Sequence, residues 1–317
     1  MKIWVIIAII LVILGASIVL LAASSADWNF ANLGTNKYET NTHSITQTFS
    51  AISIQTNTAD IVFLPSEDGV CKVSCYENTK LKHSLTVADG VLTVNMIDER
   101  KWYDHIGIGF NSPKITVYLP QSEYTSLTIK NATGDIDIGS TFSFEHINID
   151  LSTGDVYCAA SAQKDIIITA STGDISLANL SAGSLSLEVS TGDIAISNAT
   201  IAGGVSIDVS TGDVDLRNVK CSSLTANGTT GDIKLAHVLA SEKIFIERVS
   251  GKIAFSASDA PEITLLTTSG DVSGSLLSEK IFTVKTSSGD IDIPPSMPGG
   301  RCNITTTSGD VTIQIEK

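Results

Sequence analysis

A glycine that recurs at an almost constant spacing limits most strongly how this 317-residue chain can fold. Ten copies stand 19 or 20 residues apart, each inside a tetrapeptide such as Ser-Thr-Gly-Asp. An aspartate follows the glycine in every copy except one, in which Lys252 follows Gly251. The nine regular pairs are Gly134, Asp135, Gly154, Asp155, Gly173, Asp174, Gly192, Asp193, Gly212, Asp213, Gly231, Asp232, Gly270, Asp271, Gly289, Asp290, Gly309 and Asp310. A period of this length indicates a repeat architecture.

The residues around each glycine alternate between apolar and polar. Isoleucine or valine stands two positions after every glycine, and a second, mostly apolar column stands four positions after it. Two further apolar columns lie seven and five positions before the glycine, as at Ile166 and Ile168. Alternation with a period of two predicts strands with one buried face. Each repeat therefore contains two short strands joined by a glycine turn, and a third corner absorbs the one-residue differences in length.

Such a repeat cannot bury its apolar residues alone, so successive repeats must stack around a shared core. Their strands would pair in parallel about 4.8 Å apart, and ten coils would form a rod roughly 45–50 Å long. A helical repeat is excluded because glycine and β-branched residues are poor helix formers. The predicted fold is all-β: a parallel β-solenoid, or β-helix, of 19–20-residue coils over residues 127–317.

The glycine turn has a chemistry of its own. Glycine accepts positive φ without a steric penalty, and the neighbouring Ser, Thr and Asp side chains can hydrogen-bond the backbone of a corner. Nine stacked aspartates also repel one another. We interpret the aspartate column as structural because it recurs in every regular turn. A Ca²⁺-binding β-roll is the alternative, since stacked carboxylates suit a hard cation.

Residues 1–23 are expected to form a transmembrane anchor. Residues 4–23 are uncharged, and a run of 20 apolar residues is the length that a membrane-spanning helix needs. Lys2 precedes the run and Asp27 follows it, which favours a cytoplasmic N-terminus. The rival interpretation is a cleaved signal peptide, although its apolar core is usually shorter. In both cases the rest of the chain leaves the cytoplasm, with residues 24–45 as a polar linker.

Residues 46–126 break the regular period and are expected to cap the solenoid. Thr58-Ala59-Asp60 matches the repeat, with alanine in the place of the glycine, so residues 51–63 are a degenerate first coil. Asp89-Gly90 lies between two alternating segments and predicts a β-hairpin. We therefore expect an inserted β-meander that caps the membrane-proximal end, as a stack of repeats requires for solubility.

A dense polar and aromatic stretch follows this hairpin. Arg100, Trp102, Tyr103 and His105 are the candidate residues of an exposed interaction loop. The alternative is a cap loop whose aromatic rings cover the end of the core.

Composition and motifs argue against several classes of function. The net charge of −14 is unsuited to nucleic acid, which requires clustered lysine and arginine. No catalytic or nucleotide-binding motif occurs, and the five histidines show no metal-ligand spacing. We therefore expect no enzyme, no catalytic or metal residues and no cofactor.

The cysteine count is odd, and most of the thiols are expected to be small core residues; one disulfide between distant segments is the alternative. The five cysteines are Cys71, Cys75, Cys158, Cys221 and Cys302. Cys71 and Cys75 would lie roughly 13 Å apart on one strand, too far for a disulfide.

The chain resembles a known family, the bacterial membrane-anchored putative adhesins with the β-strand-repeat domain of unknown function 4097. The resemblance rests on the apolar N-terminus, Thr-Ala-Asp-Ile at 58–61, Arg-Lys-Trp-Tyr-Asp-His at 100–105, Lys-Ile-Thr-Val-Tyr-Leu-Pro at 114–120 and the serial Thr-Gly-Asp turns. It covers nearly the whole chain. It implies a β-solenoid outside the membrane of a bacterium and supplies no functional residues.

The expected function is therefore that of a cell-surface module, an adhesin or scaffold at the outer face of the cytoplasmic membrane. Its partners would be the lipid bilayer, through residues 4–23, and an envelope protein or glycan. The alternative is an accessory protein of an envelope-stress or regulatory system. The strand at Val311–Ile315 is expected to be an unpaired edge that allows weak self-association.

Overall fold

The computed structural model describes residues 2–25, 37–100 and 112–316. It begins with helix α1 (Lys2–Ser25), and every other described element is a strand. No helix within the described residues counts as long and apolar enough to cross a membrane.

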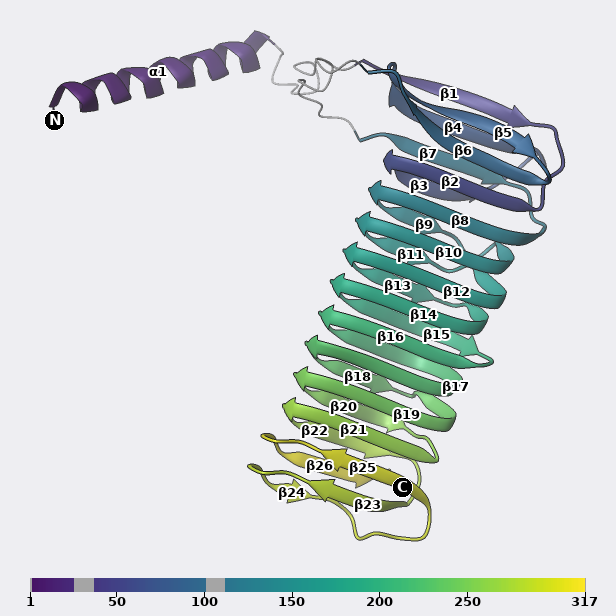
Figure 1. The fold of residues 1–317 in the computed structure, drawn as a ribbon, viewed down its shortest axis with the longest axis vertical. Coiled ribbons are helices and arrows are strands. Elements are labelled where there is room, and N and C mark those ends of the chain that lie inside the picture. The colour runs from purple at the N-terminus through teal and green to yellow at the C-terminus, as the bar shows by residue number, and fades with distance from the viewer. Residues whose placement is uncertain (1, 26–36, 101–111, 317) are drawn as a thin grey trace.

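The body of the molecule is a parallel β-solenoid of about ten turns (Figure 1). One series of strands ends at the glycine turns: β8 (Glu123–Thr133), β10 (Ser143–Thr153), β12 (Ser161–Thr172), β14 (Ser181–Thr191), β16 (Gly204–Thr211), β17 (Val214–Thr230), β19 (Leu239–Ser250) and β21 (Glu262–Ser269). A second series follows the turns: β9 (Ile136–Ile138), β11 (Val156–Cys158), β13 (Ile175–Ala178), β15 (Ile194–Ile201), β18 (Ile233–Ala236), β20 (Ile253–Ser258) and β22 (Val272–Leu276). β17 contributes to both series because it runs through the third corner without a break.

The register of the ladder follows the columns of the sequence. Ile147 pairs with Ile166, and Ile166 pairs with Leu185 in the next coil. These side chains point inward and are at most 2% exposed, and they belong to one core that runs through the solenoid and the cap. All five cysteines are buried and free, so the expectation that most of them are core residues agrees with the structure.

The C-terminal end of the solenoid departs from the order of the sequence. The final strands are β23 (Lys280–Lys285), β24 (Ile291–Asp292), β25 (Gly300–Thr305) and β26 (Val311–Ile315). β25 pairs with both β21 and β23, and β26 pairs with both β22 and β24. The last coil of the sequence is therefore the penultimate coil of the stack, as Figure 1 shows.

The expectation that Val311–Ile315 is an unpaired edge is therefore wrong. Strand β26 has a partner on each side, and the terminal coil consists of β23 and β24. Ile281 and Ile291 on this terminal coil are 48% and 46% exposed. The error arises because the 19–20-residue period does not specify which of the two final coils, β23–β24 or β25–β26, stacks directly on β21 and β22.

The cap combines parallel and antiparallel pairing. Its strands are β1 (Tyr38–Ile45), β2 (Ala51–Thr58), β3 (Asp60–Pro65), β4 (Cys71–Asn78), β5 (Leu81–Ala88), β6 (Val91–Asp98) and β7 (Lys114–Leu119). β2 and β3 form the degenerate first coil and pair in parallel with β8 and β9. β6 and β7 lie against the other edge of this coil, also in parallel.

The remaining cap strands pair antiparallel. β5 and β6 form the hairpin around Asp89-Gly90, while β4 pairs with β7 on one edge and β1 on the other. Residues 38–45 thus form a strand, although they lie inside the segment that the sequence analysis assigned to a linker. The sequence of β1 is polar and its residues are exposed or half-buried, so no alternation marks it as a strand.

Candidate functional site

The glycine turns form one continuous column along the solenoid. All ten glycines of the column have positive φ, between 126° and 155°. Their backbones also approach closely: a Cβ added at Gly192 would lie 2.0 Å from the carbonyl oxygen of Gly173 in the preceding coil. Conformation and space therefore both require glycine here.

The aspartates after the glycines form a hydrogen-bonded ladder between coils. The backbone N–H of Asp174 donates to Oδ1 of Asp155 at 2.8 Å, and the N–H of Asp193 donates to Oδ1 of Asp174, also at 2.8 Å. The ladder starts at Asp60 in the cap and runs to Asp232, which accepts the N–H of Lys252. Each carboxylate thus satisfies a backbone donor that the turn leaves without a partner.

Substitutions of Asp193 separate this acceptor role from the charge of the side chain. Asp193→Ala removes the acceptor of the Asp213 N–H, which lies at 2.7 Å, and is expected to cost about 1 kcal/mol of unfolding free energy. Asp193→Asn keeps an oxygen acceptor and removes a like charge, so it should retain the stability of the parent. Chemical denaturation of the two variants measures the difference.

The same experiment tests the Ca²⁺ alternative. If the column is structural, Ca²⁺ or a chelator should leave the melting temperature of the parent protein unchanged. A rise of several degrees with Ca²⁺, lost equally in both variants, would favour an ion ladder instead.

The candidate interaction loop is described only at its start. Arg100 donates from Nε and from its backbone N–H to Oδ1 of Asp98, so its guanidinium is held by a neighbouring carboxylate. Trp102, Tyr103 and His105 lie outside the described residues.

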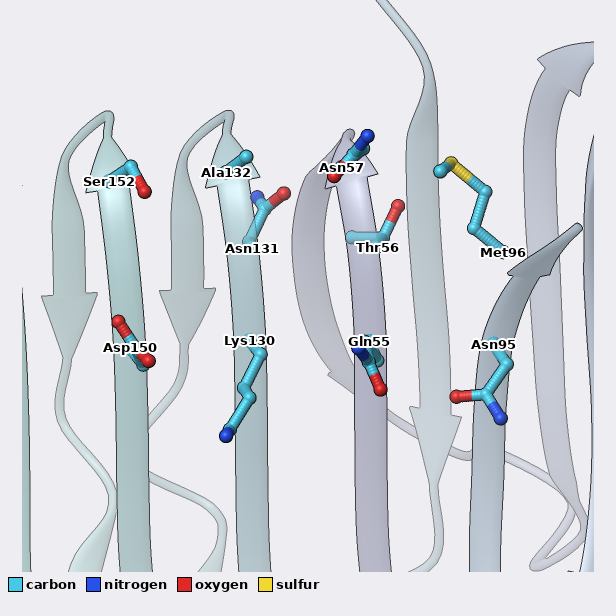
Figure 2. Close-up of a pocket in the computed structure, with 10 residues that line it drawn as sticks. All are labelled: Gln55, Thr56, Asn57, Asn95, Met96, Lys130, Asn131, Ala132, Asp150 and Ser152. Carbon is cyan, nitrogen blue, oxygen red and sulfur yellow. The ribbon is translucent and has the colours of Figure 1, made fainter. Parts of the chain in front are cut away.

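A polar groove opens on the cap where two parallel strands separate. β2 pairs with β6 only as far as Gln55 and Asn95, whereas β2 stays paired with β8 to Thr58. The separation leaves a cavity of about 520 Å³ beside the end of β6 (Figure 2). It is lined by Gln55, Thr56, Asn57, Asn95, Met96, Lys130, Asn131, Ala132, Asp150 and Ser152.

The lining of this groove is rich in amides. Gln55, Asn57 and Asn95 are exposed, and a side-chain amide both donates and accepts hydrogen bonds. Lys130 and Asp150 supply one charge of each sign on neighbouring strands. The groove is therefore suited to a neutral, hydroxyl-bearing ligand.

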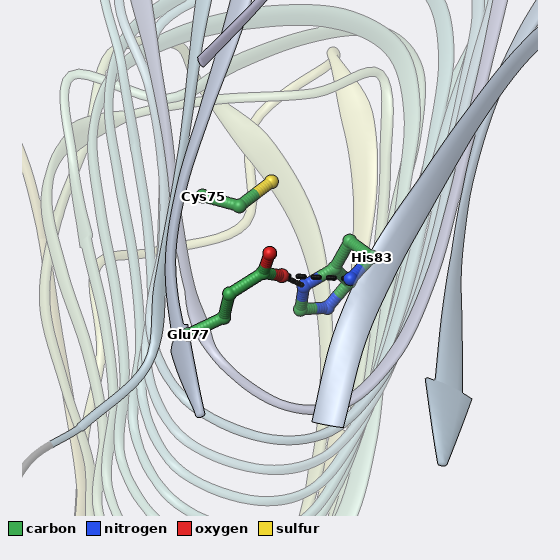
Figure 3. A group of neighbouring side chains, drawn as sticks. All are labelled: Cys75, Glu77 and His83. Atoms are coloured by element: carbon green, nitrogen blue, oxygen red, sulfur yellow. Dashed lines mark hydrogen bonds and ion pairs between the residues drawn. The ribbon is translucent and has the colours of Figure 1, made fainter. Parts of the chain in front are cut away.

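A buried polar cluster lies in the cap beside the groove, connected to it through Thr56. Oε2 of Glu77 accepts hydrogen bonds from the backbone N–H of His83 at 2.7 Å and from Nδ1 of the same residue at 2.8 Å (Figure 3). His83 Nε2 lies 2.9 Å from Oγ1 of Thr56, and Asn41 Nδ2 donates to Oε1 of Glu77 at 2.8 Å. Cys75 lies next to the pair and is fully buried.

This cluster was not predicted from the sequence, although a signal exists. Cys71, Val73, Cys75 and Glu77 occupy alternate positions of one strand, so Glu77 falls in a column that is otherwise apolar. Glu77 is 1% exposed and His83 is 7% exposed. Buried polar groups of this kind need partners. One partner comes from the adjacent strand β5, and the others come from β1 and β2, which are farther away in the sequence.

Two buried basic side chains inside the solenoid, Arg248 and Lys280, were also not predicted from the sequence. Arg248 is 1% exposed and donates to the carbonyl oxygens of Val209 at 2.9 Å and Gly212 at 3.2 Å, two coils away. Its guanidinium passes Gly228, where an added Cβ would lie 2.0 Å from one of the terminal nitrogens. Burial lowers the pKa of Arg248, and nearby aspartates, Asp213 foremost, act in the opposite direction.

Lys280 makes a similar crossing at the distal end. Its Nζ lies 2.5 Å from Oδ1 of Asp259 and donates to the carbonyl oxygen of Ala260 at 2.8 Å. Ser278 Oγ accepts a third hydrogen bond at 2.8 Å. The Lys280 side chain is 1% exposed.

The sequence model of the Toastrack family, DUF4097, matches residues 49–280 and again residues 250–317. No curated protein matches the chain.

Solved structures are similar to the chain at low sequence identity. A putative lipid binding protein from Parabacteroides distasonis is 18% identical, with a TM-score of 0.52 over 76% of this chain and 98% of that one. A putative adhesin from Bacteroides fragilis is 15% identical, with a TM-score of 0.43 over 88% of this chain and 97% of that one. At such identities only the fold is shared.

Proposed function

Because the chain belongs to the Toastrack family, DUF4097, we propose that it is a non-enzymatic, adhesin-like surface module that binds an envelope glycan. The observation that carries the proposal is the amide-lined groove between β2 and β6. Amide groups match the paired donors and acceptors of sugar hydroxyls. A lipid is less well suited, because exposed amides and charges line the groove.

The absence of enzymatic activity is part of the proposal. Cys75, Glu77 and His83 combine a thiol, a carboxylate and an imidazole, as a nucleophilic site would. All three are at most 7% exposed, so a substrate cannot reach them without opening of the cap. The aspartates at the turns are exposed or half-buried, but Oδ1 of Asp155 and of Asp174 each accepts a backbone N–H of the next coil.

We also propose that residues 4–23 hold the module at the outer face of a bacterial cytoplasmic membrane. The support is the uncharged run of 20 residues in the sequence. Apolar side chains of α1 such as Val12 and Leu21 are exposed, and lipid would remove this surface from water. The groove would then face the cell wall.

The test uses the full-length protein in detergent micelles and purified cell-wall sacculi. We expect the protein to sediment with the sacculi, and the variant Gln55→Ala/Asn57→Ala/Asn95→Ala to bind at least about tenfold more weakly, equivalent to a loss of about 1.4 kcal/mol. Asn148→Ala, an exposed amide on β10 outside the groove lining, is the matched control. Equal binding of all three proteins would refute the groove.

The anchor is tested by fractionation of bacterial cells that produce the protein. The full-length protein should stay in the membrane pellet after a high-salt wash, and a variant without residues 2–25 should not. Release of both proteins by the wash would contradict the anchor while leaving the glycan assay decisive for the groove.

A further inference from the structure

The buried cluster in the cap contains three donor atoms of the kinds that bind transition metals. One atom each from Cys75, Glu77 and His83 lies within 4.8 Å of the other two. Cys75 and Glu77 are two residues apart on β4, so both point to the same side of the strand, while His83 comes from β5. Figure 3 shows the three side chains converging on one space.

Thiolate sulfur, imidazole nitrogen and carboxylate oxygen are the ligands of protein-bound zinc, at distances of roughly 2.0–2.3 Å. Four such ligands around a tetrahedral ion lie roughly 3.3–3.8 Å from one another, as follows from these bond lengths. The present His83–Glu77 contact of 2.8 Å would therefore lengthen by a fraction of an ångström on binding. Small changes in the χ angles of Glu77 and His83 would provide this adjustment.

The surrounding hydrogen bonds already resemble the outer shell of a metal site. A metal-ligating histidine usually donates its other ring N–H to an oxygen acceptor, and ligating carboxylates are themselves hydrogen-bonded. Here Thr56 Oγ1 lies 2.9 Å from His83 Nε2, and Asn41 holds Oε1 of Glu77. These contacts leave His83 Nδ1 and Glu77 Oε2 directed at each other, with the Cys75 side chain on the same side of β4 as Glu77.

Cys75 differs in its surroundings from Cys71, the other thiol of β4, because the Glu77 carboxylate lies beside Cys75 on the same face of the strand. A divalent cation would reverse the electrostatics of this position.

We propose that Cys75, Glu77 and His83 form a binding site for a zinc-like divalent transition metal, with one coordination position left for water. On binding, the Cys75 thiol loses its proton to solvent, and the imidazole proton moves from Nδ1 to Nε2, from which it is donated in a hydrogen bond to Thr56 Oγ1. The metal would fasten β4 to β5, and through Asn41 to β1. This proposal does not depend on the glycan function.

The test is titration of the full-length protein in detergent micelles with Co²⁺, in the presence of a phosphine reductant. We expect one Co²⁺ per chain and a thiolate-to-cobalt charge-transfer absorption, both displaced by Zn²⁺. Cys75→Ala should abolish the charge-transfer band, whereas Cys71→Ala, which removes a buried thiol on the same face of the same strand, should keep it.

Variants of the outer shell keep the test decisive if Cys75→Ala fails to fold. Asn41→Ala and Thr56→Val leave all three ligands in place and are expected to weaken Co²⁺ binding by about 10–100-fold. Absence of a charge-transfer band in the folded parent protein, or Co²⁺ affinity unchanged in both outer-shell variants, would overturn the proposal. A band that persists in Cys75→Ala would also overturn it.

Discussion

Gly192→Ala is expected to lower the melting temperature of the solenoid by on the order of 10 °C. The φ of Gly192 is 146°, and a Cβ there would lie 2.0 Å from the Gly173 carbonyl oxygen. Backbone strain of this kind costs about 1–3 kcal/mol, and overpacking costs a similar amount. In a domain of this size each kcal/mol shifts the melting temperature by about 2–4 °C.

Gly204→Ala is the matched control, because Gly204 lies outside the turn column and its φ is not positive. The nearest atom to an added Cβ is the Oγ of Ser223 at 3.1 Å, which belongs to a side chain that can rotate. We expect this variant to stay within about 1 kcal/mol of the parent. Equal melting temperatures for the two variants would show that the turn column tolerates side chains.

The second large effect is expected at Lys280. Lys280→Ala would leave the Asp259 carboxylate, which is 14% exposed, without its cation and the Ala260 carbonyl oxygen without its donor. Removal of one partner from a buried ion pair costs about 3–5 kcal/mol. Lys285→Ala, at the exposed end of the same strand, should be close to neutral.

The readout for Lys280 should be local, because coils of a solenoid contact only their neighbours and terminal coils can open separately. We expect amide hydrogen exchange to accelerate in β23–β26 of Lys280→Ala and to stay unchanged in β10–β14. Exchange rates in the distal coils that match those of Lys285→Ala would contradict a clamping role for Lys280.

Lys280 also bridges the distal coils that stack out of sequence order. Its side chain starts on β23 and bonds to Asp259 and Ala260, which precede β21, while β25 lies between these two strands. The crossing passes Gly300, where an added Cβ would lie 3.2 Å from Nζ and 2.4 Å from the Pro261 carbonyl oxygen. A glycine at the start of β25 therefore leaves room for a lysine that spans it.

The solenoid could be predicted from the amino-acid sequence alone. Glycine is needed where φ is positive and where the next coil lies within contact, and β-branched residues two positions later lie in the core at Ile175 and Ile194. Both requirements are local to a coil and recur with every coil. They therefore appear in the sequence as columns, and the 19–20-residue period could be read without knowledge of the tertiary structure.

Where the period gives no order, the neighbours of a coil or strand depend on contacts that form in the folded protein. A stack of equivalent coils is unchanged when two of them exchange places, so the period could not show that Val311–Ile315 would lie between β22 and β24. β1 carries no alternation, and its place is set by the free edge of β4. The Cys75, Glu77 and His83 cluster likewise depends on contacts between β1, β2, β4 and β5, because a buried polar side chain is stabilised by partners that no local pattern specifies.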